Sequence, residues 1–359
     1  MTLVARRPPD GAALVRARAP LRLGLAGGGT DLASYSDVHG GVVLNATIDR
    51  FAYASVRLRA DPVVRMVAAD MGLEETEQAA LPLPLEGMTK LHRGVYNRIV
   101  REFCGGRPFG VTITTMIDAP PGSGLGSSSA LVVALVEAFR ELLGLPLGRY
   151  DVAHVAFEIE RLELALEGGK QDHYAAAFGG VNLIEFLPSD RVIVNPLRVA
   201  DATLWELQSS IIICFTGHSR SSGQIIKDQV SSVTSKDKIT LEGMHQLKSD
   251  AMAMKSALLV GDLPGMARIL DHSWQAKKST AVSISTPLID NLWNVAHKEG
   301  AMAGKVSGAG GGGFMFFLVD PDDRMRVTRA LKEAGGEPDK IYLTHKGAEA
   351  WTIGRSNGS

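Results

Sequence analysis

Residues 121–130 read Pro121-Gly122-Ser123-Gly124-Leu125-Gly126-Ser127-Ser128-Ser129-Ala130, and they join a β-type run, Val111–Ile117, to an apolar helix-type run, Ala130–Leu143. Glycines in such a loop let backbone N–H groups turn toward an anion with no Cβ in the way. The N-terminus of the expected helix adds unpaired amides and roughly +0.5 of an elementary charge. We therefore predict that a phosphate chain is bound here, by Pro121, Gly122, Gly124, Leu125, Gly126, Ser127, Ser128 and Ser129.

Two common nucleotide-binding motifs do not match this loop. A P-loop requires a Lys, and no Lys follows Gly126 or Ser127. The dinucleotide pattern Gly-x-Gly-x-x-Gly would place Gly at position 127, which is Ser. A Gly/Ser helix cap that binds no ligand stays as the alternative for this stretch alone.

The composition is that of a globular protein. The chain has 359 residues, of which 45% are hydrophobic and 21% charged, and 38 Lys+Arg nearly balance 39 Asp+Glu. This length suits one large domain or two ordinary ones. The near-neutral balance gives no support to nucleic-acid or membrane-surface binding, which would require a basic excess.

Cysteine usage and hydropathy favour a soluble protein of the cytoplasm. The only two cysteines, Cys104 and Cys214, exclude a disulfide framework. No stretch reaches the ~20 apolar residues of a membrane span, and the N-terminal region lacks the apolar core of a signal peptide.

The order of segments predicts an α+β fold in two domains, 1–200 and 201–359. Strands are expected at Leu14–Ala26, Val42–Ile48, Ala52–Leu58, Val111–Ile117, Val181–Phe186, Val192–Val194, Ile211–Phe215, Gly304–Ser307 and Phe314–Val319. Helices are expected at Lys90–Phe103, Ala130–Leu143, Asp151–Glu167, Met244–Val260, Leu263–Lys277, Pro287–Glu299 and Met325–Ala334. Met71–Gly87 is acidic and contains prolines, which indicates a loop, and Gly217–Lys238 is polar, which indicates a mobile lid.

Two further glycine-rich stretches lie far from the central loop. Arg18-Ala19-Pro20-Leu21-Arg22-Leu23-Gly24-Leu25-Ala26-Gly27-Gly28-Gly29-Thr30-Asp31 lies near the N-terminus, and Val306-Ser307-Gly308-Ala309-Gly310-Gly311-Gly312-Gly313 lies near the C-terminus. In order and spacing the three stretches resemble the motifs of the GHMP kinases, which include galactokinase and the homoserine, mevalonate and phosphomevalonate kinases. The resemblance spans roughly residues 16–345 and implies a two-domain GHMP-kinase-like fold with the active site in the interdomain cleft.

Within that family the resemblance is greatest to the bacterial kinases that act on D-glycero-D-manno-heptose 7-phosphate in surface-polysaccharide synthesis. It rests on Leu23–Asp31, Gly168–Asp172, Tyr174–Gly180 and Phe215–Arg220. It implies ATP- and Mg²⁺-dependent phosphorylation of the anomeric hydroxyl, giving the 1,7-bisphosphate. Two alternatives stay open: a sugar-1-kinase for an unphosphorylated fucose-, galactose- or mannose-like sugar, and a catalytically silent regulator that senses sugar and ATP.

Catalytic roles follow from the same resemblance. Asp172 matches the family's catalytic base, and a carboxylate of ordinary pKa can accept a hydroxyl proton. Arg22 matches a cation beside that base, where it would stabilise charge on the phosphoryl group. Lys170 offers a second cation. A loop or cap role for Asp172 and a solvent-facing position for either cation are the alternatives.

The family's metal-binding Glu corresponds to Glu160. Together with the hydroxyl of Ser128, or of its neighbour Ser127, it would hold Mg²⁺, which prefers one or two carboxylates plus phosphate oxygens and water. Glu158 and Glu163 compete for this role, and a solvated helix face is the alternative for any of the three. His173 departs from the Gln that related sugar kinases often carry at this place.

The acceptor site is expected at the first and third motifs. Asp31 matches the family's sugar-binding Asp, since a carboxylate accepts two hydroxyl donors well. The other residues expected there are Gly28, Gly29, Thr30, Gly310 and Gly311. For the sugar's own phosphate, Arg220 is the preferred residue; Lys277 and Lys278 are a second option, although surface charge is the favoured interpretation of both. The expected partner is thus a small sugar phosphate, with a homodimer as one option for the assembly.

Overall fold

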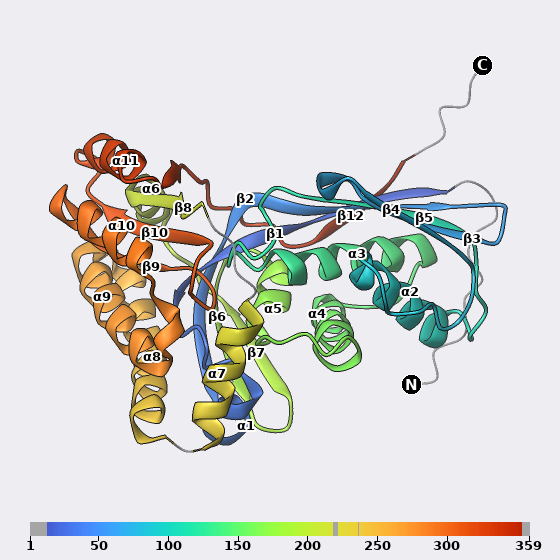
Figure 1. The fold of residues 1–359 in the computed structure, drawn as a ribbon, viewed down its shortest axis with the longest axis horizontal. Coiled ribbons are helices and arrows are strands. Elements are labelled where there is room, and N and C mark those ends of the chain that lie inside the picture. Colours follow the sequence, from blue (N-terminus) through green and yellow to red (C-terminus); the bar gives the residue numbers. More distant parts are fainter. Residues whose placement is uncertain (1–12, 218–221, 236, 354–359) are drawn as a thin grey trace.

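The structure is a computed structural model that describes residues 13–217, 222–235 and 237–353. Within these residues the strands form an eight-stranded sheet and a four-stranded sheet, one in each half of the molecule (Figure 1). The larger sheet contains β1 (Leu14–Ala26), β2 (Gly41–Leu58), β3 (Val63–Ala68), β4 (Leu73–Gln78), β5 (Val111–Ile117), β6 (Val181–Leu187), β7 (Arg191–Pro196) and β12 (Glu349–Ile353). The smaller contains β8 (Ile211–Phe215), β9 (Ala301–Val306), β10 (Phe314–Val319) and β11 (Glu337–Asp339).

The strand order of the larger sheet is β12-β1-β2-β5-β3-β4, with β6 and then β7 added along a second stretch of β2. This branching is possible because β2 is 18 residues long: residues 52–58 pair with β5, and residues 41–46 pair with β6. The antiparallel pair of β1 and β2 is therefore the frame on which the site is built.

Helices cover both sheets. In the larger half these are α1 (Ala33–His39), α2 (Lys90–Phe103), α3 (Ser127–Leu143), α4 (Arg149–Phe157) and α5 (Gln171–Phe178). In the smaller half they are α6 (Asp201–Ser210), α7 (Ser222–Thr234), α8 (Lys238–Val260), α9 (Leu263–Thr280), α10 (Pro287–Lys298) and α11 (Arg324–Glu333). Figure 1 shows α2, α3 and α4 beneath the larger sheet and α8 to α11 around the smaller one.

Helix α3 is the centre of the larger core. Its sequence is apolar all round, and residues 130–139 are buried without exception. A helix of this kind must be enclosed, and it packs against β1 and β2 on one side and α4 and α5 on the other. The N-terminus of α3, and with it the Gly/Ser loop, is thereby held against the core, while Pro121, Gly122 and Ser128 of the loop remain exposed.

The predicted α+β class is confirmed, and several elements differ from prediction. Met71–Gly87 is not a loop throughout, since Leu73–Gln78 forms β4 and pairs with β3. This strand was missed because its sequence, Leu-Glu-Glu-Thr-Glu-Gln, is polar; it is an edge strand whose side chains alternate between half-buried and exposed. Within Gly217–Lys238, residues 222–234 form α7 rather than a loop, and residues 218–221 lie outside the described residues.

Two further boundaries shift in ways that matter for the site. The expected helix Asp151–Glu167 is α-helical only to Phe157 and continues as one π-helical turn, Glu158–Glu163. Such wider turns occur often at functional sites. The last strand, β12, pairs with β1, so a segment beyond residue 201 belongs to the larger sheet.

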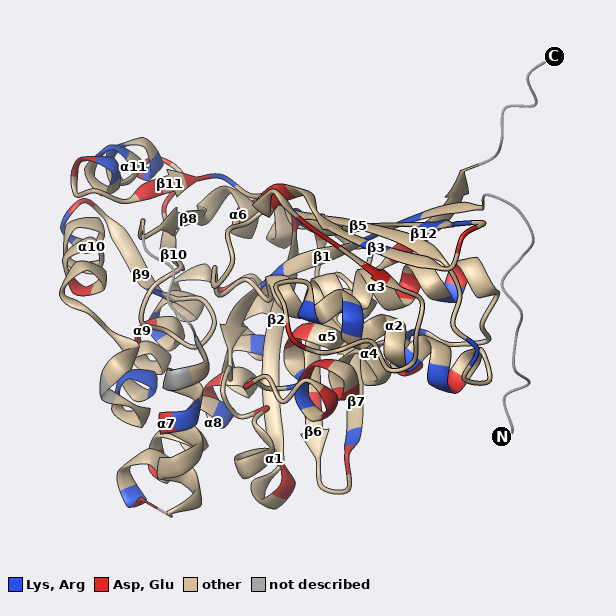
Figure 2. Ribbon diagram, turned by 45° about the vertical axis from the view of Figure 1, so that its right-hand side comes forward, with Lys and Arg blue, Asp and Glu red and all other residues tan. Residues whose placement is uncertain are grey.

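Positively and negatively charged residues are mixed along the described part of the chain and do not gather into separate regions. Figure 2 shows Lys/Arg and Asp/Glu segments side by side along helices such as α11. No helix among the described residues combines the length and apolarity that spanning a membrane would need.

Candidate active site

Two glycine motifs from distant parts of the chain meet at the centre of the molecule. The Ser123 carbonyl accepts a hydrogen bond from Phe314 N (2.8 Å), and the Leu125 carbonyl accepts one from Arg22 N (3.0 Å). A Cβ on Gly124 would overlap the Ser307 carbonyl, and one on Gly308 would lie 2.8 Å from the Gly124 Cα. The two loops therefore contact each other directly through their backbones, which only glycine permits.

A cavity of about 290 Å³ opens beside this junction. Its lining includes most of the residues expected from the sequence, namely Arg22, Gly28, Gly29, Asp31, Pro121, Gly122, Gly124, Gly126, Ser127, Ser128 and Asp172. Leu125 and Ser129 are buried and do not line the cavity: Leu125 belongs to the core, and the Ser129 hydroxyl contacts Glu160. The N-terminus of α3 lies at Ser127, three residues earlier than expected, so the serines form its first turn.

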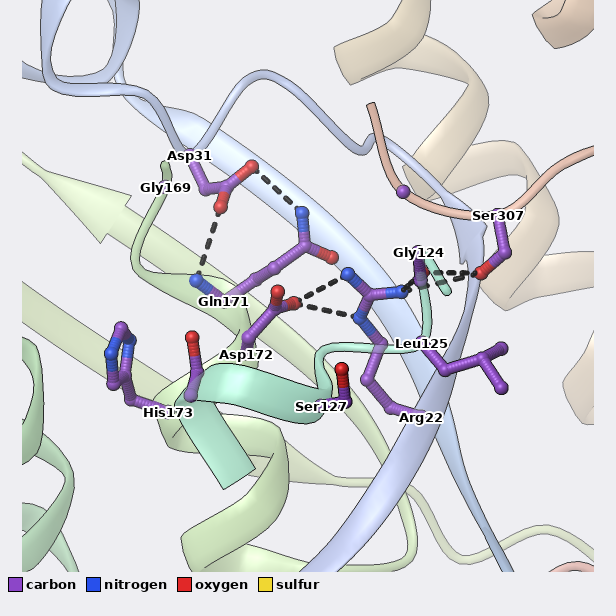
Figure 3. Close-up of polar contacts among 12 residues, drawn as sticks. Arg22, Asp31, Gly124, Leu125, Ser127, Gly169, Gln171, Asp172, His173 and Ser307 are labelled. Carbon is purple, nitrogen blue, oxygen red and sulfur yellow. Dashed lines mark hydrogen bonds and ion pairs between the residues drawn. The ribbon is translucent and has the colours of Figure 1, made fainter. Parts of the chain in front are cut away.

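Asp172 and Arg22 form an ion pair at the bottom of this cavity. Arg22 donates from Nε to Asp172 Oδ1 (2.7 Å) and from Nη1 to the Gly124 carbonyl (2.6 Å), as Figure 3 shows. Asp172 lies in the first turn of α5, so the helix N-terminus adds favourable charge. Gly126 adopts φ of +76°, and a Cβ there would lie 3.1 Å from the Asp172 Cγ. The carboxylate thus lies directly against the glycine loop.

Lys170 does not join this pair. Its Nζ lies 2.5 Å from Asp190 Oδ1 and 5.4 Å from the centre of the Phe157 ring, and the residue does not line the cavity. Lys170 immediately precedes α5, and its ammonium is drawn away from Asp172 by the tertiary contact with Asp190. The predicted second cation beside the base is therefore not found at this residue.

Glu160 is the centre of a second polar cluster, behind the serines. Its carboxylate accepts hydrogen bonds from the hydroxyls of Ser128 and Ser129, each at 2.7 Å, and lies 2.7 Å from His173 Nε2. Arg161 Nη1 lies 3.3 Å from it. Burial by itself would raise the pKa of Glu160, but Arg161, His173 and Ser129 together lower that pKa to about 2. Glu160 is therefore ionised and held in one orientation.

The chemistry of this donor set is compatible with Mg²⁺, since it offers a hydroxyl and an ionised carboxylate. Ser128 Oγ lies at the cavity wall, whereas Glu160 lies behind it, does not itself line the cavity, and accepts the hydrogen bond of Ser128 with Oε1. Both are hard oxygen donors, and phosphate oxygens and water would complete the set. The competing carboxylates point elsewhere: Glu158 and Glu163 both pair with Arg98.

Asp31 lines the cavity beside Gln171. Its carboxylate accepts from Gln171 N (3.1 Å) and Gln171 Nε2 (2.9 Å), as Figure 3 shows, and also from Gly29 N (3.0 Å). Burial raises the pKa of Asp31, and the nearby Asp172 adds to this, although the backbone N–H groups oppose it. A Cβ on Gly169 would overlap the Asp31 carboxylate, so this close approach depends on glycine.

Three residues expected at the acceptor site do not line the cavity. The Thr30 hydroxyl bonds to the Gly27 and Val42 carbonyls, and so it holds the turn together. A Cβ on Gly310 would lie 2.8 Å from the Ile284 carbonyl, and Gly311 faces Ile225. Gly308 and Ala309 line the cavity in their place. Arg220 lies outside the described residues.

Lys277 and Lys305 also line the cavity; the sequence interpretation named Lys277 only as a second option for the sugar's phosphate and missed Lys305. Each is only 4% exposed, so Lys277 is not the surface charge that was favoured. A signal existed: Met266, Leu270 and Trp274 mark the buried face of α9, and helical spacing continues that face to Lys277. Lys305 interrupts the otherwise apolar run Ala301–Val306, which is unusual for a buried strand.

The far end of the cavity is mostly apolar. It is formed by Ala68, Met71, Met88, Leu91 and Ile117, with Asp70, His92 and Thr115 among them. These residues come from β3, α2, β5 and the turns beside them. The cavity therefore combines an apolar slot, an anion-binding loop and a polar end around Asp31 and Asp172.

Comparisons with known proteins agree with this geometry. Residues 90–180 match the model of the GHMP kinase N-terminal domain, and residues 254–337 match that of the C-terminal domain. A D-glycero-alpha-D-manno-heptose 7-phosphate kinase from Campylobacter jejuni is 40% identical over 94% of this chain and 99% of its own.

Solved structures extend the likeness to the fold. One described as a D-glycero-D-manno-heptose 1-phosphate kinase from Bacteroides thetaiotaomicron has a TM-score of 0.81 and 42% identity, covering 95% of this chain and 99% of its own. Galactokinase from Lactococcus lactis shares only the fold, with a TM-score of 0.75 and 18% identity over 94% of this chain and 95% of its own. On this evidence of sequence and fold, the chain belongs to the GHMP kinase family.

Proposed function

We propose that this kinase transfers the γ-phosphoryl group of ATP to the anomeric hydroxyl of D-glycero-D-manno-heptose 7-phosphate, giving the 1,7-bisphosphate for surface-polysaccharide precursors. Family membership makes the donor ATP and the reaction a phosphoryl transfer. The observation that carries the proposal is the Arg22–Asp172 pair lying against the glycine loop, in a chain 40% identical to a heptose 7-phosphate kinase.

The nucleotide is proposed to bind along the cavity. Its phosphates would lie over Gly122–Ser128, where the amides at the N-terminus of α3 favour negative charge. Its base would then lie in the apolar slot between Met71, Met88 and Leu91. Ser128 and Glu160 would hold Mg²⁺, which when bound neutralises charge on the β- and γ-phosphates.

In the proposed reaction Asp172 is the general base. The anomeric oxygen forms a bond to the γ-phosphorus, the bond from that phosphorus to the β–γ bridging oxygen breaks, and ADP leaves with that oxygen. Asp172 accepts the hydroxyl proton as the new bond forms. Arg22 orients the Asp172 carboxylate, and its guanidinium provides fixed positive charge beside the transferring group.

Asp31 is proposed to orient the acceptor. Three N–H donors fix its carboxylate, yet it faces the cavity and keeps acceptor capacity for sugar hydroxyls. Gly28 and Gly29 bring bare backbone to the same wall, so a sugar can approach closely. A sugar placed between Asp31 and Asp172 would present one hydroxyl to each carboxylate.

An acceptor screen tests this function. ADP release would be measured with the heptose 7-phosphate, the heptose 1-phosphate, unphosphorylated heptose, fucose, galactose and mannose, and the product would be located by ³¹P NMR. We expect turnover to be fastest with the 7-phosphate and the new phosphate to appear at C1. Faster turnover of a neutral sugar would favour the first alternative, and no turnover of any acceptor would favour the regulator. The cytoplasmic location and a homodimer stay predictions.

A further inference from the structure

Lys277 and Lys305 lie in the same cavity but take no part in the proposed transfer. They come from α9 and β9, in the smaller half of the molecule, and both are almost fully buried. Buried lysines are rare unless they are paired with an acid or bind a ligand. Their presence therefore requires an explanation that the phosphate loop and the catalytic pair do not supply.

Neither lysine has an acidic partner among the residues that the structure describes. Lys277 Nζ donates to the Gly308 carbonyl at 2.5 Å, and no carboxylate lies within 4.0 Å of it. Lys305 Nζ lies 5.8 Å from the centre of the Phe316 ring and makes no ion pair either. Arg22, by contrast, is neutralised by Asp172 at 2.6 Å. Two lysines without a direct carboxylate contact thus line the same cavity.

The space in front of Lys277 is bounded by further hydrogen-bond donors. A Cβ built on Gly28 would lie 3.9 Å from Lys277 Nζ and 3.7 Å from Gln171 Nε2. The absence of a side chain at Gly28 therefore leaves a recess between an ammonium and an amide. Gln229 of α7 lines the cavity as well, and its Nε2 donates to Thr280 Oγ1 at 2.8 Å, which ties α7 to the end of α9.

The electrostatics of this recess favour an anion. Burial lowers the pKa of Lys277 to about 8, and the positive charge of Arg22 adds to this, while Asp31 and Asp172 act in the opposite direction. Burial, Lys277 and Arg22 lower the pKa of Lys305 still further, with Asp250 opposing. The two ammonium groups thus destabilise each other, and a dianion between them would remove that cost.

We propose that Lys277 and Lys305 form a second anion subsite, separate from the phosphate loop, which binds a phosphate monoester carried by the acceptor. The inference rests on the proposed function, because it assigns a place to the phosphate that the acceptor already has. The recess beside Gly28 lies next to Asp31, so a sugar held by Asp31 can direct its phosphate toward the lysines while its anomeric hydroxyl faces Asp172. A second dianion in a cavity that already holds a triphosphate needs cations of its own.

Kinetics with two acceptors tests the subsite. Wild type, Lys277→Met, Lys305→Met and the control Lys278→Met would be compared on the heptose 7-phosphate and on unphosphorylated heptose. Lys278 is the next residue of α9, its Nζ lies 5.6 Å from the centre of the Trp274 ring, and it does not line the cavity.

Losing one buried partner of a charged pair costs about 30-fold or more in affinity, so we expect KM for the phosphorylated acceptor to rise by that factor in Lys277→Met and Lys305→Met. KM for ATP and for unphosphorylated heptose should change less than about threefold. An equal loss with both acceptors, or one confined to ATP, would overturn the proposal.

A binding measurement separates this proposal from the proposed function. With the nucleotide site saturated by a non-hydrolysable ATP analogue, inorganic phosphate is titrated calorimetrically into each protein. We expect one phosphate to bind to wild type and Lys278→Met, and binding to be at least about tenfold weaker in Lys277→Met and Lys305→Met, with Lys277→Arg retaining it. If that pattern holds but no heptose is phosphorylated, the function fails and the subsite stands. If heptose 7-phosphate is phosphorylated but phosphate binds equally to all variants, the subsite fails alone. Thermal unfolding of each variant would identify any that does not fold.

Discussion

Each of the two proposed walls of the cavity, one for the nucleotide and one for the acceptor, has a fully buried carboxylate: Glu160 lies behind Ser128, and Asp31 lines the cavity itself, and the pKa values of the two carboxylates shift in opposite directions. On the nucleotide side, Glu160 has two hydroxyl donors, a histidine and an arginine around it, and its pKa falls to about 2. On the proposed acceptor side, Asp31 accepts hydrogen bonds only from uncharged N–H groups and has a neighbouring carboxylate, and its pKa rises. Equal burial therefore produces opposite shifts.

The difference lies in the partners, since burial alone disfavours the charged form of any acid. Side chains of the protein itself offset the cost of burying the Glu160 charge, so this carboxylate is ionised and oriented before any ligand binds. The groups around Asp31 offset only part of the cost of burying its negative charge, and hydroxyl donors from a ligand would offset the rest. Glu160 is therefore fixed by the protein alone, whereas Asp31 is expected to reach its full set of hydrogen bonds only when the acceptor binds.

The largest effect is expected at Asp172, between the two walls. Asp172→Asn keeps the size of the side chain but cannot accept the hydroxyl proton, so kcat should fall by about 10²- to 10⁴-fold. Neither wall is altered, and KM for ATP and for the acceptor should change little. Coupled ADP-release kinetics measures all three constants. A kcat within tenfold of wild type would remove Asp172 as the base.

Asp31→Asn tests the acceptor wall. The amide retains one acceptor oxygen but places an N–H₂ group toward the donors of Gln171, and a hydrogen bond to a charged group is worth about 1.5–3 kcal/mol. We expect KM for the acceptor to rise by about 10- to 150-fold while KM for ATP is unchanged. If ATP binding weakened equally, the assignment of this wall to the acceptor would be wrong.

Glu160→Gln tests the nucleotide wall and should give the reverse pattern. The substitution removes the negative charge that contacts Ser128 and Arg161. The Mg²⁺ concentration needed for half-maximal rate should therefore rise by about tenfold. KM for ATP should rise as well, and KM for the acceptor should not change. Glu163→Gln is the matched control, because Glu163 lies in the same helical turn but pairs with Arg98. Equal effects in the two variants would argue for a merely structural disturbance.

Much of this arrangement could be predicted from the sequence, because glycine and apolar periodicity are local signals. Leu14–Ala26, Lys90–Phe103 and Val111–Ile117 were predicted with the bounds that the structure gives. The glycines of the loop and Asp31, which the sequence placed at one site, line the same cavity, while their roles stay predictions.

What escaped prediction depends on tertiary contacts. The direction of Lys170 is set by Asp190, across a turn that no local pattern encodes. The burial of Lys277 and Lys305 follows from where α9 and β9 pack, whereas charge alone had favoured an exposed position for Lys277. The polar edge strand β4 forms because β3 lies beside it, not because its residues favour strands.

The smallest effect expected is a difference in acid unfolding, and its sign separates the two carboxylates. Glu160 has a lower pKa folded than its ordinary 4.5, so its ionised form stabilises the protein above that pH, and the contribution is lost as pH falls toward 2. In the folded protein the pKa of Asp31 lies above its ordinary value of 3.8. Just above pH 3.8 the folded state therefore binds more protons than the unfolded state, and the contribution of Asp31 to stability increases as pH falls through that range. Urea unfolding of wild type, Glu160→Gln and Asp31→Asn between pH 7 and 3 should therefore show the advantage of wild type over Glu160→Gln shrinking on acidification, by at most about 3 kcal/mol. Relative to Asp31→Asn, wild type should gain stability over the same interval. Parallel curves for all three proteins would contradict the opposite shifts on which the comparison rests.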